Sequence, residues 1–251
     1  MSAVLRCFTL HAERLERDDV WRRTAGLLSA IERHGGRATL FVHPLTAIEA
    51  GADLGPQIRE ILSRGHEVGQ HTHFYAPRDG GADPDVNPVT VLSDDNVRRC
   101  LDRDLTYLRE AGADPRGFVA GAWAINDEAL RWLREKRFAY DASVRSFALG
   151  YDNPDAAAGD GWTAPILEDG LLRLPTTATV TGVARGGETP LVTDGGSYEM
   201  TYVNDYDLIQ PTRRVAAALV VGRWRPGPWT TAGDLARRIA EPGADRVSTP
   251  S

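Results

Sequence analysis

The regular alternation of short apolar runs with amphipathic segments constrains the fold of this chain more than any other feature. Apolar runs that resemble strands cover residues 3–10, 38–43, 66–70, 117–122 and 138–140. Segments with the start and stop signals of helices follow these runs. Strand and helix alternate at least five times with short links, which is typical of parallel strands wrapped by helices. We therefore expect an α/β fold.

The individual elements follow from local signals. Asp18 or Asp19 is expected to cap a helix that runs to about His34, and Asn126 is expected to cap a later one. Further strands are predicted over residues 171–175, 176–183 and 200–203, and helices over residues 56–64, 94–112, 210–221 and 231–240. No composition break marks a domain boundary, so we predict one domain over residues 1–240 and a C-terminal tail over residues 241–251.

Charge and hydropathy exclude two classes of partner. The net charge is −6, with acidic and basic residues interleaved and no basic stripe, so a nucleic-acid partner is not expected. Nothing near 18 consecutive apolar residues occurs, so no membrane partner is expected either. The chain begins without the long apolar region of a secretory signal, which predicts a cytoplasmic protein if this is the natural start. Oligomeric state is not predicted.

Polar and aromatic residues of chemical interest follow the predicted strands at their carboxyl ends. These residues are His11, Glu13, His71, His73, Trp123, Asp141 and Asn204. In parallel α/β folds the chemistry gathers at this edge of the sheet. Residues two apart on an extended backbone point to the same side, which applies to His11 with Glu13 and to His71 with His73. The pattern predicts one shared site.

Two histidines and one carboxylate form a recognised catalytic zinc set in which water holds the remaining position. We therefore expect Glu13, His71 and His73 to be metal ligands. Water on such a metal has a pKa of about 7 and is a strong nucleophile, and a spare histidine or carboxylate of the group is suited to take its proton. The alternative is that these four polar residues only hydrogen-bond to neighbouring loops. The residues alone leave both interpretations open.

Several segments resemble motifs of the polysaccharide deacetylase family, carbohydrate esterase family four. The run Gly65-His-Glu-Val-Gly-Gln-His71 resembles its second motif, and Gly117-Phe-Val-Ala-Gly-Ala-Trp-Ala-Ile-Asn126 resembles its third. Looser likenesses extend from about residue 5 to residue 240. The resemblance implies a distorted (β/α) barrel of about seven parallel strands. It also implies a metal-dependent hydrolase that removes acyl groups from amino sugars or related amides.

At four positions where the family has catalytic or metal-binding residues, or a residue that pairs with them, this chain has a different residue. His11 stands where the family has a base Asp, and Glu13 fills the position of the acidic metal ligand. The second histidine of the family's His-x-x-x-His motif falls on Tyr75, a much poorer ligand because its pKa is about 10. Val119 replaces an Arg that pairs with the base Asp, and Asn204 replaces a His that acts as general acid or stabilises the oxyanion.

Three hypotheses follow. In the first, the chain is a hydrolase with a rebuilt site, in which His11, Glu13, His71 and His73 hold a divalent metal, expected to be zinc, or move its protons, and Asn204 polarises the carbonyl. In the second, the same barrel runs a metal-independent reaction with His11 as general acid/base, oriented by Glu13. In the third, it is a non-catalytic module that binds a sugar or another small molecule.

The expected partner is a small intracellular substrate, an acylated amino sugar or amide in a biosynthetic pathway. Three residues are expected to bind it: Tyr75, Trp123 and Asp141. Trp123 suits stacking on a sugar or aromatic ring, but it is equally suited to a core position. Asp141 has a second interpretation as the cap of a loop.

Overall fold

A curled, mostly parallel sheet forms the centre of the molecule. The computed structural model describes residues 4–74, 77–78, 81–82, 93–148, 159–186, 190–193, 196–224 and 229–240. Within these residues the strand order is β10-β12-β1-β2-β3-β6-β7-β9-β8, and all neighbours except β9 and β8 are parallel. The parallel strands are β1 (Leu5–Ala12), β2 (Ala38–Val42), β3 (Glu67–Thr72), β6 (Gly117–Ala120), β7 (Tyr140–Asp141), β9 (Leu171–Arg173), β10 (Ala178–Thr179) and β12 (Gly196–Asn204).

Shorter strands complete the sheet at its margins. The strands β8 (Ile166–Glu168) and β11 (Leu191–Thr193) are antiparallel to β9 and β12, and β13 (Trp229–Thr230) is parallel to β1. A separate antiparallel pair is formed by β4 (Pro77–Arg78) and β5 (Gly81–Ala82). Among the described residues no ladder joins β9 to β10, so the curled sheet stays open there.

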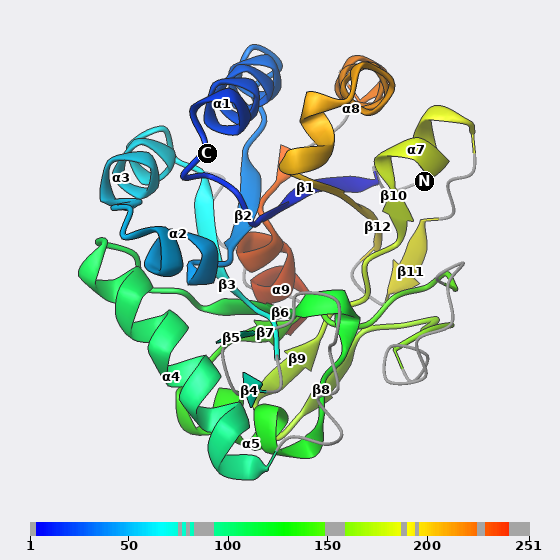
Figure 1. Ribbon diagram of the computed structural model, residues 1–251. Coiled ribbons are helices and arrows are strands. Elements are labelled where there is room, and N and C mark those ends of the chain that lie inside the picture. The colour runs from blue at the N-terminus through cyan, green and yellow to red at the C-terminus, as the bar shows by residue number, and fades with distance from the viewer. Residues whose placement is uncertain are drawn as a thin grey trace, which may run out of the picture.

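Helices cover the outside of the sheet, as Figure 1 shows. They are α1 (Asp18–Glu32), α2 (Leu45–Ala50), α3 (Gly55–Ser63), α4 (Asp94–Glu110), α5 (Asp127–Glu135), α7 (Val180–Ala184) and α8 (Pro211–Arg223). Two 3-10 turns, η2 (Gly121–Trp123) and η3 (Tyr206–Ile209), follow β6 and β12. This arrangement confirms the predicted single-domain α/β fold, a distorted (β/α) barrel of mostly parallel strands.

The alternation of side chains along β1 divides the core into an outer and an inner layer. Phe8 and Leu10 point outward into an apolar cluster that they share with the surrounding helices. Cys7 points inward to a second cluster that includes Phe41 and Met200. Both faces of the strand are therefore buried, which is usual for a parallel sheet covered by helices.

The last helix, α9 (Ala232–Ala240), fills the inside of the curled sheet rather than covering its outer face (Figure 1). Its Ala232 and Leu235 side chains belong to the inner apolar cluster. The first turn is anchored at the amino ends of two strands, because the Ala232 N–H donates to Thr39 Oγ1 and the Gly233 N–H donates to Glu67 Oε2. The end of the sheet opposite to the predicted site is closed in this way.

Two local predictions are corrected, and one short helix was not foreseen. Asp18 and Asp19 lie in the first turn of α1 and do not cap it, because the N-cap position is Arg17, which makes no side-chain cap bond. The strand predicted over residues 176–183 is only β10, because Thr179 caps α7 by accepting from the Gly182 N–H. The short helix α2 was not predicted, since its six residues carry little periodicity.

Asn126 caps α5 as predicted, through its side-chain oxygen and the Ala129 N–H. No helix within the described residues is both long and apolar enough to cross a membrane. The predicted tail, residues 241–251, and the substrate residue Tyr75 lie outside the described residues.

Candidate metal centre and active site

The carboxyl ends of β1 and β3 bring Glu13, His71 and His73 together. The Nε2 atoms of the two histidines lie 3.1 Å apart. Glu13 Oε1 is 3.5 Å from His71 Nε2, and Glu13 Oε2 is 3.5 Å from His73 Nε2. Each of the three side chains offers one possible ligand atom, and these atoms all lie within 4.8 Å of one another. Among the described residues, no other group of three or more such side chains was found. The structure thus places together the three predicted ligands.

The orientation of His71 is set by the neighbouring strand. Its Nδ1–H donates to the carbonyl oxygen of Val119 on β6, at 2.9 Å, because a carbonyl oxygen can only accept. In the neutral imidazole the Nε2 atom then carries a lone pair, and this lone pair faces Glu13 and His73. A backbone partner on the far nitrogen is a common support for a metal-bound histidine. His71 is therefore presented in the tautomer that a metal requires.

The spacing of the donors fits a tetrahedral metal ion. Zinc–nitrogen and zinc–oxygen bonds of about 2.0–2.1 Å at tetrahedral angles separate neighbouring ligand atoms by about 3.3 Å. The three measured separations, 3.1, 3.5 and 3.5 Å, lie close to that value. Two imidazole nitrogens and a carboxylate are also a donor set that zinc accepts. The residues therefore fit a divalent metal with one or more positions left for water or substrate.

The charge of the cluster also suits a cation. Burial by itself would raise the pKa of Glu13, but the neighbouring His71 and His73 imidazoles outweigh burial and hold the pKa well below its ordinary value. Glu13 is therefore ionised at neutral pH. Burial lowers the pKa of His73, which favours its neutral form, the form that coordinates metals.

His11 lies beside this cluster, inside a group of aromatic rings. Its ring centroid is 5.0 Å from that of His71, 4.9 Å from that of Tyr202 and 5.1 Å from that of Trp123. The side chain is 4% exposed. Burial, with smaller contributions from His71 and His73, keeps the pKa of His11 well below its ordinary value. His11 is therefore a neutral imidazole at pH 7.

Trp123 is brought to the site by a tight turn after β6. Two consecutive residues without glycine's freedom, Ala122 and Trp123, adopt positive φ angles of 48° and 63°. Such strain persists where the surrounding structure determines the conformation, and it clusters at functional sites. The Trp123 ring also contacts the Arg145 guanidinium, 4.8 Å from its centroid, and is 4% exposed. Trp123 thus belongs to the inner wall of the site, and stacking on a substrate stays a prediction.

Asn204 and Asp141 occupy different places. Asn204 is paired in register with His11 across β1 and β12, and its Nδ2 is 3.5 Å from Asp207 Oδ2. Asp141 is fully buried, forms an ion pair with Arg173 at 2.7 Å, and accepts from the Ser143 N–H and hydroxyl. Asn204 thus lies next to the site, whereas the carboxylate of Asp141 has internal partners, as its alternative role as a loop cap requires.

His43 is a residue of the site that the sequence analysis did not assign. Its N–H donates to the Ala12 carbonyl, its Nδ1–H donates to the His71 carbonyl at 3.2 Å, and its ring lies 4.7 Å from that of His73. The buried carboxylate of Asp104 is 3.8 Å from His43 Nδ1. His43 follows β2 directly, so the rule of polar residues at strand ends, applied without exception, would have found it.

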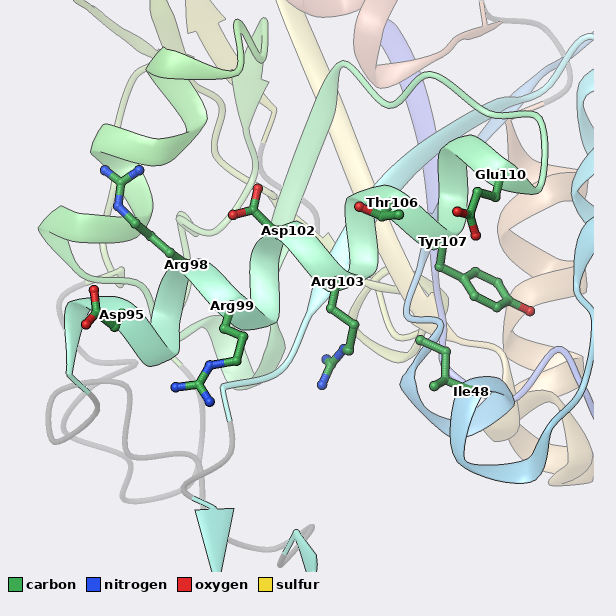
Figure 2. Close-up of a pocket in the computed structure, with 9 residues that line it drawn as sticks. All are labelled: Ile48, Asp95, Arg98, Arg99, Asp102, Arg103, Thr106, Tyr107 and Glu110. Atoms are coloured by element: carbon green, nitrogen blue, oxygen red, sulfur yellow. The ribbon is translucent and has the colours of Figure 1, made fainter.

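A groove on the outer face of α4 is distinct from this cluster. It has a volume of about 690 Å³ and includes Arg98, Arg99 and Arg103, which project from α4 in Figure 2. Arg98 pairs with Glu128 and Glu135, and Arg103 pairs with Asp104. Its lining contains none of the predicted catalytic or metal residues. The convergent donors at the strand ends, and not this groove, form the candidate active site.

Comparison with known proteins identifies the family. The family model described as polysaccharide deacetylase matches residues 15–140, which is half of the chain. This chain belongs to the polysaccharide deacetylase family. The matched part of this deacetylase-family chain contains His71 and His73, but it starts after Glu13 and ends before Asn204. No curated protein sequence matches the chain.

Solved structures confirm the fold of this polysaccharide deacetylase family member. A Mycobacterium smegmatis protein assigned as a polysaccharide deacetylase has 17% identity and a TM-score of 0.64, covering 99% of this chain and 93% of that one. The peptidoglycan deacetylase PdaC from Bacillus subtilis has 13% identity and a TM-score of 0.57, covering 98% and 96%. A CE4-family pseudoenzyme of Bacillus anthracis has 11% identity and a TM-score of 0.54, covering 94% and 66%.

Proposed function

We propose that this chain is a metal-dependent hydrolase that removes an acyl group from the nitrogen of a small amide or acylated amino sugar. The observation that carries the proposal is the convergence of Glu13, His71 and His73 at the spacing of a tetrahedral metal face. Membership of the polysaccharide deacetylase family supports the same class of reaction. Zinc is the metal proposed, because its ligand preferences match this donor set.

Residues around the metal ligands are assigned the proton transfer and the stabilisation of the developing negative charge. A divalent cation held there would supply Lewis acidity to the amide carbonyl and to the attacking water. His11, which lies beside His71, is the residue positioned to accept the proton of that water and return it to the leaving amine. Asn204, in register with His11, donates a hydrogen bond to the carbonyl oxygen as negative charge develops on it.

Metal content and acyl release test this proposal. Protein purified without added metal is analysed by mass spectrometry for bound metal, and acetate release from chitin oligomers and simple N-acetyl amides is measured. We expect about one zinc per chain, lost in His71→Ala and in His73→Ala. The matched control is His34→Ala, which removes a histidine near the end of α1 and should keep the metal. His11→Asn should also keep the metal while kcat falls by about 10²–10⁴-fold.

Other results would point elsewhere. A wild-type protein that holds no metal, with turnover that depends on His11, would replace this proposal by a metal-independent acid/base reaction. The second candidate is a non-catalytic binding module, which is favoured by Val119 and Asn204 at altered positions and by the structural likeness to a pseudoenzyme. Ligand binding that survives His11→Ala and His71→Ala together, with no turnover, would support that candidate.

A further inference from the structure

Glu13 lies beyond the last residue of β1, so the ladder between β1 and its neighbours does not hold its backbone. Both polar atoms of the peptide group that follows Glu13 are nevertheless bound by side chains. The Glu13 carbonyl oxygen accepts from Thr46 Oγ1 at 2.7 Å, and the Arg14 N–H donates to Asp205 Oδ2 at 2.9 Å. Thr46 lies in α2, and Asp205 directly follows β12, so side chains from two distant segments bind one peptide group.

Asp205 also binds on the other side of Glu13. Its own N–H donates to the His11 carbonyl at 2.9 Å, one step beyond the register pair of His11 and Asn204. Its second carboxylate oxygen accepts from the Tyr206 N–H at 2.7 Å. One residue, 191 positions away from Arg14 in sequence, therefore fixes the chain on both sides of Glu13.

Burying the Asp205 carboxylate has a desolvation cost that lowers the stability of the fold. Asp205 has no exposed surface. A buried carboxylate is tolerated when its oxygens are hydrogen-bonded, and here both oxygens accept backbone N–H groups. A turn that served only to connect β12 to η3 would need the bond to Tyr206 and not the one to Arg14.

We propose that Asp205 and Thr46 are positioning residues that hold the Glu13–Arg14 peptide plane and so aim the Glu13 carboxylate at His71 and His73. The inference rests on the proposed function, because Glu13 is aimed as a metal ligand. It goes further by assigning roles to two residues that make no contact with the metal ligand atoms. Outer residues that orient ligands typically change metal affinity by about 10–100-fold when they are removed.

Metal affinity provides the first test. Cobalt(II) is titrated into metal-free protein in competition with a chelator, and its visible spectrum reports the ligand geometry. Asp205→Ala and Thr46→Val should each weaken cobalt binding about 10-fold or more and alter the spectrum. Thr46→Ser keeps the hydroxyl and should therefore retain both the wild-type cobalt affinity and the wild-type spectrum. The matched control is Asp207→Ala, two residues later in η3. The Asp207 carboxylate accepts from Asn204 and not from the Arg14 N–H, so this change should leave cobalt affinity unchanged.

Hydrogen exchange of the Arg14 amide provides a second test that needs no metal. In metal-free Asp205→Ala this amide should exchange at least 10-fold faster than in wild type and in Asp207→Ala. Unchanged protection of Arg14 would overturn the proposal, as would cobalt affinity within twofold of wild type in Thr46→Val. If wild-type protein bound no metal, the proposed function would fail, while the exchange of Arg14 would still decide whether Asp205 holds this backbone.

Discussion

At the scale of single residues, the candidate metal centre depends on a close contact between Gly121 and His73 that leaves no space for a side chain at position 121. The backbone of Gly121, directly after β6, packs against the ring of His73. A Cβ atom at this position would lie 2.2 Å from His73 Cγ, well inside any real contact. Gly121 does not have a positive φ, so its backbone conformation does not require glycine. Glycine is needed there because any side chain would collide with the His73 ring.

Replacing Gly121 by alanine should therefore displace His73. We expect Gly121→Ala to weaken metal binding by about 10-fold or more, because one of three ligands moves. Overpacking should also lower the free energy of unfolding by about 1–3 kcal/mol. Gly26→Ala in α1 is the control: a Cβ there meets nothing within 4 Å, and the change should stabilise the helix by up to about 1 kcal/mol. Equal metal affinity in the two variants would contradict this role of Gly121.

At the scale of elements, the two ends of the sheet have separate tasks. The carboxyl ends of β1 and β3 carry the ligands, whereas the amino ends of β2 and β3 anchor α9. Glu67 is central to this anchor, since it accepts from the Thr39 hydroxyl, the Tyr140 hydroxyl and the Gly233 N–H. Because these strands run parallel, the α9 anchor and the candidate metal centre lie at opposite ends of the sheet, an arrangement known from other barrels.

This division predicts that Glu67→Ala lowers stability without changing metal affinity. Three donors lose their acceptor, so we expect the free energy of unfolding to fall by about 2–4 kcal/mol. Urea unfolding measures this loss, and cobalt titration of the folded variant measures the affinity. Glu60→Ala serves as control, because its exposed pair with Arg64 should contribute less than about 1 kcal/mol. A loss of metal affinity in Glu67→Ala would show that the two ends are coupled.

At the scale of the whole molecule, buried ionisable groups give opposing pH dependences of stability. Burial raises the pKa of Asp205 to about 7, and it raises those of Glu67 and Asp104 as well. Burial lowers the pKa values of His11 and His43. Raised carboxyl pKa values make stability fall as pH rises, whereas lowered histidine pKa values make it rise with pH toward 6.5. A single curve for the wild type therefore mixes both effects.

The contribution of Asp205 can be isolated with Asp205→Asn. An unfolded Asp has a pKa of about 3.9, so between about pH 4 and 7 the folded protein binds one proton that the unfolded chain lacks. The stability that this residue contributes is complete below about pH 4 and declines by about 1.4 kcal/mol per pH unit as pH rises through 7. Urea unfolding of the two metal-free proteins from pH 4.5 to 7.5 should show that slope in their difference. Parallel curves would contradict it.

Much of the fold could be predicted because its signals are local. Alternating strands and helices indicated a parallel α/β fold, and the resemblance of residues 65–71 and 117–126 to family motifs indicated a barrel. The strand ends also indicated which polar residues share an edge, and Glu13, His71 and His73 do converge. Their roles in catalysis stay predictions, as does that of Asn204.

The local sequence pattern determined the elements and the edge at which the polar residues gather. Only the tertiary structure decided which partners hold those residues in place. The tautomer of His71 depends on a carbonyl of β6, and the peptide group after Glu13 depends on Thr46 and Asp205. These contacts join segments 33 to 191 residues apart, so they follow from strand register and side-chain packing, which short-range periodicity does not encode.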